Sequence, residues 1–397
     1  ISCSLVGSEM CIRDRYTMKK YIYIYLFVYG ALLVSCNLQN STSIVDVKYE
    51  VNINPDESKT LNFSKTADFI KYVPLETTKE ALIKHVEKMF ITDSLIIIFD
   101  DMLSDIFLFD QEGKYINKCG RKGEGPGEHI LFNDVSFDKS TNLVFAHEAI
   151  KRVMYIYNMS GDLIREIPTD HIWFRSFCKV DNGYWIYTGY NNDDTDNSLL
   201  KVDDDFAIIR GQFPQKVFFR TIIHSTFIQK ENEKYFISPY DNIIYRIYND
   251  SLAPYIRIDF GDKTLPYEKI ATFSDEKEYN KLIEKNNYLG YLGDFLFYRD
   301  QLYFTFSSIS ENSLQYIACY DIELNKVNIY DGYSLYRKKN FKFNDMTFMQ
   351  PKATFENDLV FLIHPYELQE KDMQILQEDV RFHVDLDSNP ILFFMRY

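Results

Sequence analysis

Three side chains of types that bind divalent cations follow short apolar strands in separate parts of the sequence: Asp100, His147 and His364. Imidazole and carboxylate groups that converge on one point can hold a divalent cation and activate a water molecule. The alternative is that these are polar loop residues at unrelated depths. The remaining histidines show no spacing typical of metal ligands: His85, His129, His171, His224 and His383. A metal centre of Asp100, His147 and His364 is therefore one hypothesis.

A glycine-rich segment, Gly120–Glu128, has the composition of a phosphate-binding loop. A strand follows it where such a loop needs a helix, and the Gly-Lys-Ser/Thr sequence is absent. The alternative is a tight crossover between repeats, in which glycine permits close backbone approach and Pro126 restricts the chain. We favour the crossover, and Arg121 and Lys122 remain candidate contacts for an anion.

Other catalytic patterns do not stand out. The acidic run of Asp193, Asp194 and Asp196 lacks the glycine and the distal glutamate of a calcium loop, so it predicts a solvated loop. No Gly-x-Ser-x-Gly nucleophile motif is present. No cofactor is predicted, a divalent metal being the open alternative, and the sequence favours a binding protein over an enzyme.

Three cysteines of the main part of the chain, Cys119, Cys178 and Cys319, form neither a CxxC pair nor a His/Cys cluster. A zinc site of the usual spacing is therefore excluded. Their spacing does not suggest a disulfide framework, and an odd number leaves at least one thiol free. The sequence leaves the state of each cysteine open.

The composition is that of a globular protein rich in β-structure. Hydrophobic residues make up 46% of the chain, with 31 Tyr and 32 Phe against 2 Trp. Tyr and Phe favour pleated, half-buried surfaces, so this bias points to strands. The net charge of -14 excludes a sequence-independent nucleic-acid binder, because that function needs a basic surface.

A hairpin pattern recurs along the chain, in which an apolar strand, an Asp or Asn turn and a second strand follow one another. The turn residues are Asp110, Asn158, Asp203, Asn249 and Asp321, spaced 48, 45, 46 and 72 residues apart. Asp and Asn suit tight turns because their side chains cap the backbone and tolerate positive φ. Repeats of about this length are typical of four-stranded propeller blades. The long last step contains a charged, helical insertion around residues 274–285.

A second apolar strand recurs between these hairpins. Its six copies are Leu95–Phe99, Leu143–Ala146, Tyr184–Tyr187, Tyr235–Ser238, Leu302–Thr305 and Leu359–Leu362. Six copies predict an all-β fold, a six-bladed β-propeller in a single domain. A β-sandwich is the alternative, but regular spacing over the whole domain speaks against it.

The sixth blade lacks its own outer hairpin, since Asn389–Tyr397 provides only one strand. A partner strand from the N-terminal region would close the ring and remove the exposed edges of an open sheet. The candidates are Asp46–Val51 and Thr60–Phe63.

The order of strands predicts which loops share a face. If strands A to D run from the centre of a blade outward, the B-to-C and D-to-A connections lie on one face. This face is the predicted ligand-binding surface, because loops on a rigid ring commonly carry binding residues. Its candidate binding residues are Arg121, Lys122, Glu124, His147, Glu148, Tyr240 and His364.

A secretory signal precedes the repeats. Residues 18–35 have a short basic start, an apolar run and a small residue before Cys36. Leu33-Val34-Ser35-Cys36 resembles a bacterial lipobox, which predicts that Cys36 is lipidated. The alternative, a transmembrane helix, needs about 20 apolar residues, and the run from Tyr21 to Val34 is shorter. A diacylated cysteine anchors a protein stably, so we expect no transmembrane helix in the mature protein.

The domain plan follows from this signal. Residues 36–45 are a tether and residues 46–397 the single propeller domain. Residues 1–17 place Glu and Asp upstream of the signal, where only positive charge is expected. They resemble translated sequencing-adapter sequence and are interpreted as a non-native extension, a native extension being the alternative.

Five features follow one another along the chain in an order typical of one protein family. They are the lipobox, Tyr72–Thr78, the first hairpin, Gly120–Glu128 and Asn389–Leu392. Together they resemble the six-bladed β-propeller lipoproteins common in Bacteroidetes, over about residues 18–397. The resemblance implies a propeller fold and a location in the cell envelope. It implies no settled activity and no catalytic residues.

The predicted function is a lipid-anchored binding or scaffold module for an envelope protein, peptide or glycan. One alternative is a metal-dependent lyase or hydrolase with its site in the propeller channel, and another is a sensor subunit of a membrane complex. Residues 37–45 carry no acidic cluster, which favours the periplasmic side of the outer membrane over the cell surface. The ligand, any catalysis, the leaflet and the oligomeric state stay open.

Overall fold

The two middle strands of the first blade are more completely buried than its innermost strand. In β4 (Ile96–Asp100) and β5 (Asp105–Phe109) all residues are buried, because both faces of the sheet pack against neighbouring sheets. The computed structural model describes residues 46–59, 68–169, 172–189, 195–214, 226–238, 241–270, 272–273, 276–308, 315–331, 351–367 and 384–396. The elements below belong to one compact unit, residues 47–397.

The first three blades each contain four antiparallel strands, which are named from the centre of the ring outward. Blade 1 consists of β3 (Lys88–Ile91), β4, β5 and β6 (Tyr115–Lys118). Blade 2 consists of β9 (Phe132–Asp138), β10 (Leu143–Glu148), β11 (Val153–Tyr157) and β12 (Leu163–Pro168). Blade 3 consists of β13 (Ser176–Val180), β14 (Gly183–Tyr187), β15 (Asn197–Val202) and β16 (Ile208–Pro214).

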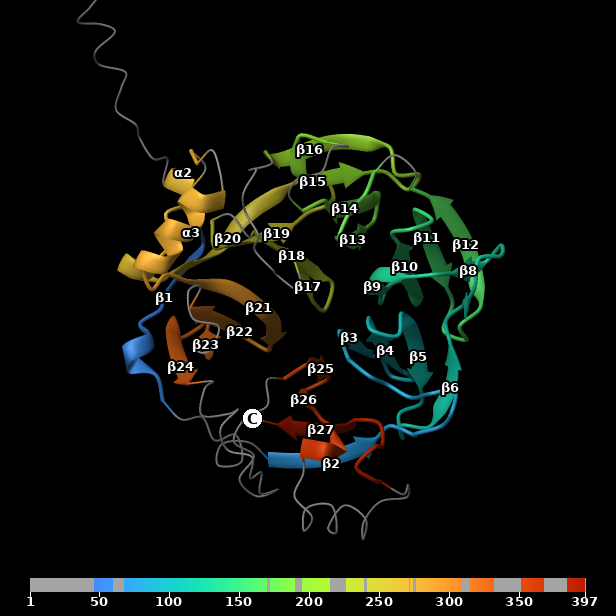
Figure 1. Cartoon of the computed structure of the whole chain (residues 1–397). Helices are drawn as coiled ribbons and strands as arrows, with labels where there is room; N and C mark the ends of the chain where they lie inside the picture. Colours follow the sequence, from blue (N-terminus) through green and yellow to red (C-terminus); the bar gives the residue numbers. More distant parts are fainter. Residues whose placement is uncertain are drawn as a thin grey trace, which may run out of the picture. The chain divides into compact units, whose positions relative to one another are not determined.

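The other three blades complete the ring shown in Figure 1. Blade 4 consists of β17 (Phe227–Lys230), β18 (Glu233–Ile237), β19 (Ile243–Ile247), β20 (Leu252–Asp259) and an added outer strand, β1 (Tyr49–Asn52). Blade 5 consists of β21 (Leu289–Tyr298), β22 (Gln301–Ser308), β23 (Gln315–Asp321) and β24 (Lys326–Asp331). Blade 6 consists of β25 (Ala353–Phe355), β26 (Asp358–Ile363), β27 (Ile391–Arg396) and β2 (Asp68–Pro74). The predicted six-bladed β-propeller is confirmed, with the first strand of each blade innermost.

Strands from both ends of the propeller unit close the ring, as expected. The outer strand of blade 6 is β2, which pairs antiparallel with β27 so that Val73 lies opposite Leu392. One of the two proposed partner segments needs correction, and the structure does not describe the other. Asp46–Val51 overlaps β1, which pairs in parallel with β20 of blade 4 instead. Thr60–Phe63 lies outside the described residues.

Asn389, at the entrance to β27, fixes the connection from β2 into blade 1. Its side-chain oxygen accepts a hydrogen bond from the Ile83 backbone N–H at 2.8 Å. Its amide donates to the backbone oxygens of Glu76 at 2.8 Å and Ala81 at 2.6 Å. Because Asn389 is only 1% exposed, these contacts are shielded from water. The segments Tyr72–Thr78 and Asn389–Leu392, which carried the resemblance, therefore meet at the ring closure.

The hydrophobic core consists of six clusters, one between each pair of adjacent blades. The expected helical insertion is α3 (Glu276–Lys285), preceded by α2 (Tyr267–Ile270), and both lie between β20 and β21. Tyr279 and Ile283 of α3 join the cluster between blades 3 and 4. The described part also contains three short 3-10 helices, at Pro55–Glu57, Gly261–Lys263 and Pro365–Glu367.

The cysteines of the described part are Cys119, Cys178 and Cys319, and each is a free, buried thiol. Burial raises the pKa of Cys119 to about 12 and the pKa values of Cys178 and Cys319 to about 11. They stay protonated and unreactive at neutral pH. Among the described residues, none of the helices has the length and apolar character to cross a membrane.

Candidate functional site

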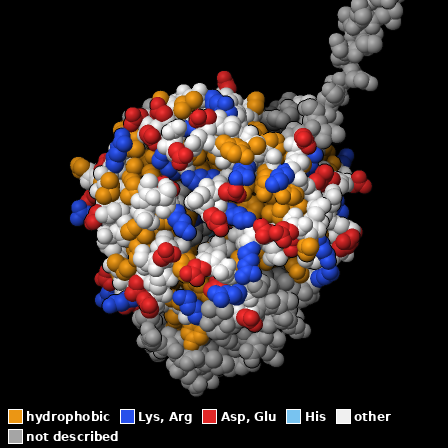
Figure 2. Space-filling model, turned by 180° about the vertical axis from the view of Figure 1, so that it is seen from behind, with side chains coloured by type: hydrophobic (Ala, Val, Ile, Leu, Met, Phe, Trp, Pro, Cys, Tyr) orange, Lys and Arg blue, Asp and Glu red, His pale blue; other side chains and the backbone are white. Residues whose placement is uncertain are grey.

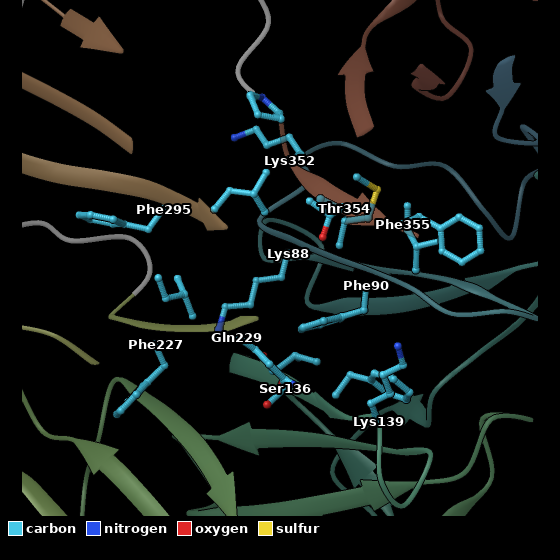
Figure 3. A pocket seen from close by; sticks show the side chains of 18 of the residues that line it. Lys88, Phe90, Ser136, Lys139, Phe227, Gln229, Phe295, Lys352, Thr354 and Phe355 are labelled. Atoms are coloured by element: carbon cyan, nitrogen blue, oxygen red, sulfur yellow. Dashed lines mark hydrogen bonds between the residues drawn. The ribbon is translucent and has the colours of Figure 1, made fainter. Parts of the chain in front are cut away.

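The innermost strands of all six blades line a cavity of about 420 Å³ along the propeller axis (Figure 3). This volume lies within the range of about 300–1,000 Å³ that is usual for ligand-binding sites. The lining side chains come from β3, β9, β13, β17, β21 and β25, so the closed ring itself forms the walls. We call this cavity the channel.

Each innermost strand contributes one phenylalanine to the channel wall. These residues are Phe90, Phe137, Phe177, Phe227, Phe295 and Phe355. Four of them belong at the same time to the buried clusters between blades, and Phe90 and Phe355 pack against such clusters. The wall is therefore both aromatic and rigid, because its rings are fixed by core packing. Six separate strands carry this feature, and no single segment of sequence revealed it.

Charged side chains of both signs also line the channel. They are Glu87, Lys88, Asp93, Lys139, Glu231, Asp294, Lys352 and Glu356. Lys352 and Asp294 form an ion pair across blades 6 and 5 at 3.5 Å. Acidic and basic side chains are likewise interspersed over the face of the molecule shown in Figure 2. The channel offers mixed polar contacts and no field of one sign.

A buried ion pair ties the channel wall together across three blades. The Lys88 ammonium on β3 donates to Asp134 on β9 at 2.5 Å and to the Val135 carbonyl at 3.2 Å. The other carboxylate oxygen of Asp134 accepts the Phe177 backbone N–H from β13 at 2.9 Å. Burial raises the pKa of Asp134, while the Lys88 ammonium opposes that rise. The pair therefore depends on Lys88 to keep the buried carboxylate charged.

The glycine-rich segment is a crossover whose carbonyl groups surround a lysine of the same chain. The Lys151 ammonium donates to the carbonyls of Gly123 at 3.2 Å, Gly125 at 3.4 Å and Glu128 at 2.6 Å. The two ends of the glycine-rich segment are β7 (Arg121–Lys122) and β8 (Glu128–His129), which pair in parallel. Carbonyls that converge on a cation present the wrong polarity for a phosphate, so the crossover interpretation agrees with the geometry.

The charged residues of this crossover lie at the surface. Arg121 is 82% exposed in its side chain and pairs with Glu128 at 3.0 Å. Lys122 donates to the Leu103 carbonyl and lies 4.0 Å from Asp105. Glu124 is exposed. Arg121, Lys122 and Glu124 are thus accessible, as a binding role requires.

Two other candidate binding residues are fully buried. His147 stacks on Phe174 with ring centroids 3.7 Å apart, and its Nε2 lies 3.2 Å from the Thr169 hydroxyl. Burial lowers the pKa of His147 to about 3, so the ring is neutral. Glu148 is 0% exposed and accepts the Lys151 backbone N–H at 3.2 Å. Both lie within β10, which extends two residues further than its apolar pattern indicated.

The remaining candidates lie apart from these. Tyr240 is outside the described residues. His364 is half-buried and stacks on Tyr366 at 5.0 Å. Asp100 is fully buried and accepts the backbone N–H groups of Lys84 at 2.6 Å, His85 at 3.1 Å and Leu103 at 2.8 Å. Asp100 therefore holds two neighbouring segments in place.

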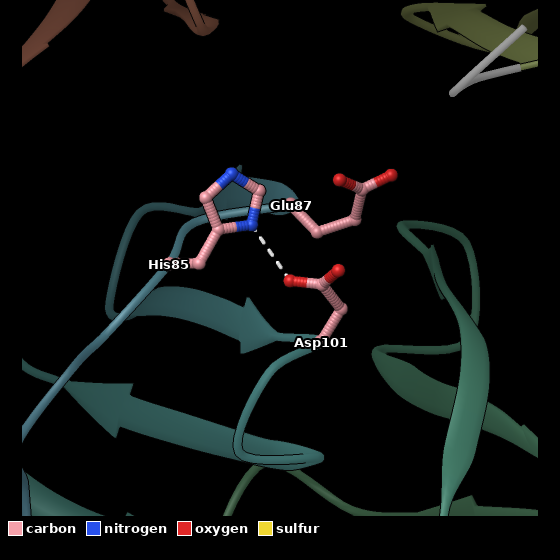
Figure 4. A group of neighbouring side chains, drawn as sticks. All are labelled: His85, Glu87 and Asp101. Atoms are coloured by element: carbon pink, nitrogen blue, oxygen red, sulfur yellow. Dashed lines mark hydrogen bonds and ion pairs between the residues drawn. The ribbon is translucent and has the colours of Figure 1, made fainter. Parts of the chain in front are cut away.

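Within the described residues, one group brings three metal-ligating atoms to within 4.8 Å of one another, and it is His85, Glu87 and Asp101. The expected set of Asp100, His147 and His364 is not such a group. The His85 Nδ1 lies 2.7 Å from an Asp101 carboxylate oxygen, and Glu87 approaches from the same extended segment as His85 (Figure 4). We call these three residues the corner group. Glu87 also lines the channel, so the group lies at its rim.

The sequence contained a weak signal for this group. His85 and Glu87 are two residues apart, and such residues point to the same side of an extended chain. The third ligand, Asp101, lies in a different loop, 14 residues beyond Glu87. The two segments meet because β3 pairs with β4, with Lys88 opposite Phe99, and because Asp100 accepts hydrogen bonds from both.

Six closed blades around an axial channel define a β-propeller, and the comparisons place it in a family. The model of a family described as a domain of unknown function, DUF4934, matches residues 47–396. The chain therefore belongs to the DUF4934 family. No curated protein matches this sequence.

Solved structures share the fold at low sequence identity. A protein from Bacteroides fragilis NCTC 9343, named as an exported protein, is 18% identical with a TM-score of 0.68, over 88% of this chain and 99% of that chain. A member of the DUF4221 family from Bacteroides vulgatus is 9% identical with a TM-score of 0.52, over 83% of this chain and 97% of that chain. These similarities support the resemblance to Bacteroidetes propellers at the level of the fold.

Proposed function

We propose that this protein is a lipid-anchored, extracytoplasmic binding module that takes its ligand into the channel. The observation that carries the proposal is the channel wall, to which each of the six blades contributes one phenylalanine. A concave site that combines apolar side chains with polar groups at fixed positions is the usual form of a small-ligand site, and the channel combines both. A peptide segment or a short glycan, with an apolar body and polar ends, has the matching chemistry.

The rigid ring supports a binding role over a purely structural one. A scaffold needs only its outer surface, whereas here an ion pair of Lys352 with Asp294 and the exposed side chain of Gln229 line an internal cavity. Such groups can hold a polar ligand without movement of the blades. The ligand then binds to a preformed site, which lowers the entropic cost of binding.

The location rests on the signal and on relatives. Residues 18–35 have the layout of a lipoprotein signal ending before Cys36, and a fold relative is named as exported. We place the protein on the periplasmic side of the outer membrane. Replacing Cys36 by Ser should release it from membranes, because the acyl chains supply the affinity. A variant with a cleaved signal that still sediments with membranes would refute the lipid anchor.

The test of the channel is a blocked variant. Gln229 is exposed within the channel, so Gln229→Trp should fill it without disturbing the core. The matched control is Ile164→Trp on the outer strand β12, where Ile164 is 57% exposed. Peptide and glycan fractions from digested cell envelopes are screened by thermal shift. We expect that some fractions raise the Tm of the wild type and of Ile164→Trp. The same fractions should leave the Tm of Gln229→Trp unchanged. Equal shifts in all three proteins would contradict channel binding.

The alternative function, a metal-dependent lyase or hydrolase with its site in the channel, is favoured by one observation, the position of the corner group at the channel rim. It requires a bound ion at His85, Glu87 and Asp101. Turnover of the same fractions that stops on chelation and in His85→Ala would replace the binding proposal with this one.

A further inference from the structure

We propose that the corner group of His85, Glu87 and Asp101 binds one divalent cation of the zinc class. The three side chains offer an imidazole nitrogen and two carboxylates within 4.8 Å of one another. This proposal does not depend on a channel ligand, so it can hold even where the proposed function fails.

The ligand types select the cation. An imidazole nitrogen and carboxylate oxygens bind zinc at about 2.0–2.2 Å, and a tetrahedral site then separates its ligand atoms by about 3.4 Å. The His85 and Asp101 atoms are already 2.7 Å apart, and small side-chain rotations bring the group to that spacing. Calcium takes oxygen ligands, usually six to eight, so a site with an imidazole suits it poorly.

The backbone that carries the ligands is fixed from below by a buried side chain. Asp100, which is 0% exposed, accepts the His85 N–H at 3.1 Å and the Leu103 N–H at 2.8 Å with its two carboxylate oxygens. It therefore holds the segment of His85 against the turn that contains Asp101. The Glu87 N–H donates to the Phe99 carbonyl at 3.0 Å, which fixes the third ligand to β4.

The start of the same segment is fixed from blade 6. Asn389 binds the Ile83 N–H and the Ala81 carbonyl, two residues that precede His85 by two and four positions. His85 and Glu87 thus sit on a chain segment held at both ends. The side chains of His85 and of Asp101, which lies in the neighbouring turn, are 49% and 43% exposed. Fixed backbone with accessible ligand atoms is the arrangement that a preorganised metal site needs.

The position of the group indicates what the ion would contact. Glu87 lines the channel, so a cation held by it lies at the channel rim. Three protein ligands leave a fourth position of a tetrahedral ion for water or for an oxygen atom of a ligand. A carboxylate or hydroxyl group at one end of a molecule in the channel is the chemistry that fits this position.

The experiment is a calorimetric titration of the full-length protein, extracted in detergent, with zinc chloride. His85→Ala removes the imidazole ligand and Asp101→Asn replaces the carboxylate by a weaker, neutral donor. Both positions are accessible, where substitutions usually affect folding little. The matched control is His364→Ala, which removes a histidine outside the corner group. Calcium chloride serves as the second probe, and thermal melts without metal check folding.

We expect one zinc ion per wild-type chain, an affinity lower by at least about tenfold in both corner variants, and no change in the control. Calcium should bind more weakly than zinc. Wild-type protein that binds no stoichiometric zinc overturns the proposal. The proposal is also overturned if His85→Ala and Asp101→Asn bind zinc as tightly as the wild type does. If calcium binds more tightly than zinc, the assignment to the zinc class is wrong.

Discussion

Two loops enter neighbouring blades on the same face of the propeller, and they use their polar groups in opposite ways. The loop of residues 119–131 leads into blade 2, and its carbonyls turn inward onto Lys151. The loop of residues 75–87 leads into blade 1, and its backbone is held from below by Asp100 and Asn389. The side chain of His85 on the second loop is 49% exposed, whereas the carbonyls of the first loop are bonded to Lys151 of the same blade.

The difference shows that a loop with a conspicuous sequence motif is not necessarily the loop whose side chains are accessible to a ligand. Glycines and basic residues made the loop before blade 2 the more obvious candidate, yet this loop forms a tight crossover around the half-buried Lys151 ammonium. In the loop before blade 1 the structural hydrogen bonds are made by Asp100, a neighbour of the ligand Asp101. A separate residue holds the backbone, and the ligand side chains remain for function.

The largest effect is expected where the strands after the two loops meet. Lys88 on β3 and Asp134 on β9 form the buried pair, so Lys88→Met should lower the free energy of unfolding at pH 7 by about 3–5 kcal/mol. The uncompensated Asp134 would have a pKa raised further above its ordinary 3.8. A carboxyl with a raised folded pKa loses stability as pH rises through that value, so the deficit should shrink on acidification.

The measurement is urea unfolding at several pH values, with Lys139→Met as the control because Lys139 is an exposed lysine of the same channel. A deficit that stays constant from neutral pH to about pH 4, or one equal to that of the control, would show that the pair does not hold the wall.

A smaller loss is expected from the anchor of the loop before blade 1. Asn389→Ala leaves the Ile83 N–H and the carbonyls of Glu76 and Ala81 without their partner, which should cost about 2–4 kcal/mol. Zinc affinity should fall as well, since the loop carries His85 and Glu87. Asn117→Ala, at an exposed position of β6, is the control in both assays. Unchanged zinc affinity would mean that Asn389 has no part in positioning the corner group.

Lys151 anchors the loop before blade 2, and its replacement should lower stability without affecting zinc binding. Lys151→Met removes the cation from three carbonyls and should lower the free energy of unfolding by about 1–3 kcal/mol. Zinc affinity should not change. Chemical denaturation beside the exposed-lysine control Lys114→Met measures the first effect. A loss of zinc binding in Lys151→Met would erase the distinction between the two loops.

The smallest effect concerns the surface charges of the glycine-rich loop. The double variant Arg121→Ala with Lys122→Ala should change the free energy of unfolding by no more than about 0.5 kcal/mol, because exposed ion pairs contribute little. Zinc binding should stay the same. A larger loss of stability in urea would indicate that these charges are part of the crossover.

The fold could be predicted because its signals are local. Each hairpin is indicated by a turn residue such as Asp110 or Asn158, and these turns recur at intervals typical of propeller blades. The closing strand could not be chosen, because Asp46–Val51 and the true strand β2 both have apolar residues and the choice depends on pairing with β27.

The candidate site was less predictable for the same kind of reason. His147 and Glu148 were expected in a loop, but the pairing of β10 with β11 continues through both residues and buries them. The corner group needs the turn of Asp101 placed against the segment of His85. The pairing of β3 with β4 and the carboxylate of Asp100 achieve this together, and no spacing in the sequence reports the contacts of Asp100. The six phenylalanines of the channel become one feature only when the ring closes.

The most direct test of the central claim, that the corner group beside the channel and not the glycine-rich loop binds a divalent cation, is an anomalous difference map. Crystals grown with one equivalent of zinc chloride are measured at the zinc absorption edge. We predict one peak at about 2.0–2.2 Å from a ring nitrogen of His85 and from carboxylate oxygens of Glu87 and Asp101. A map with no peak at these three residues, or with its peak elsewhere on the propeller, would contradict the account.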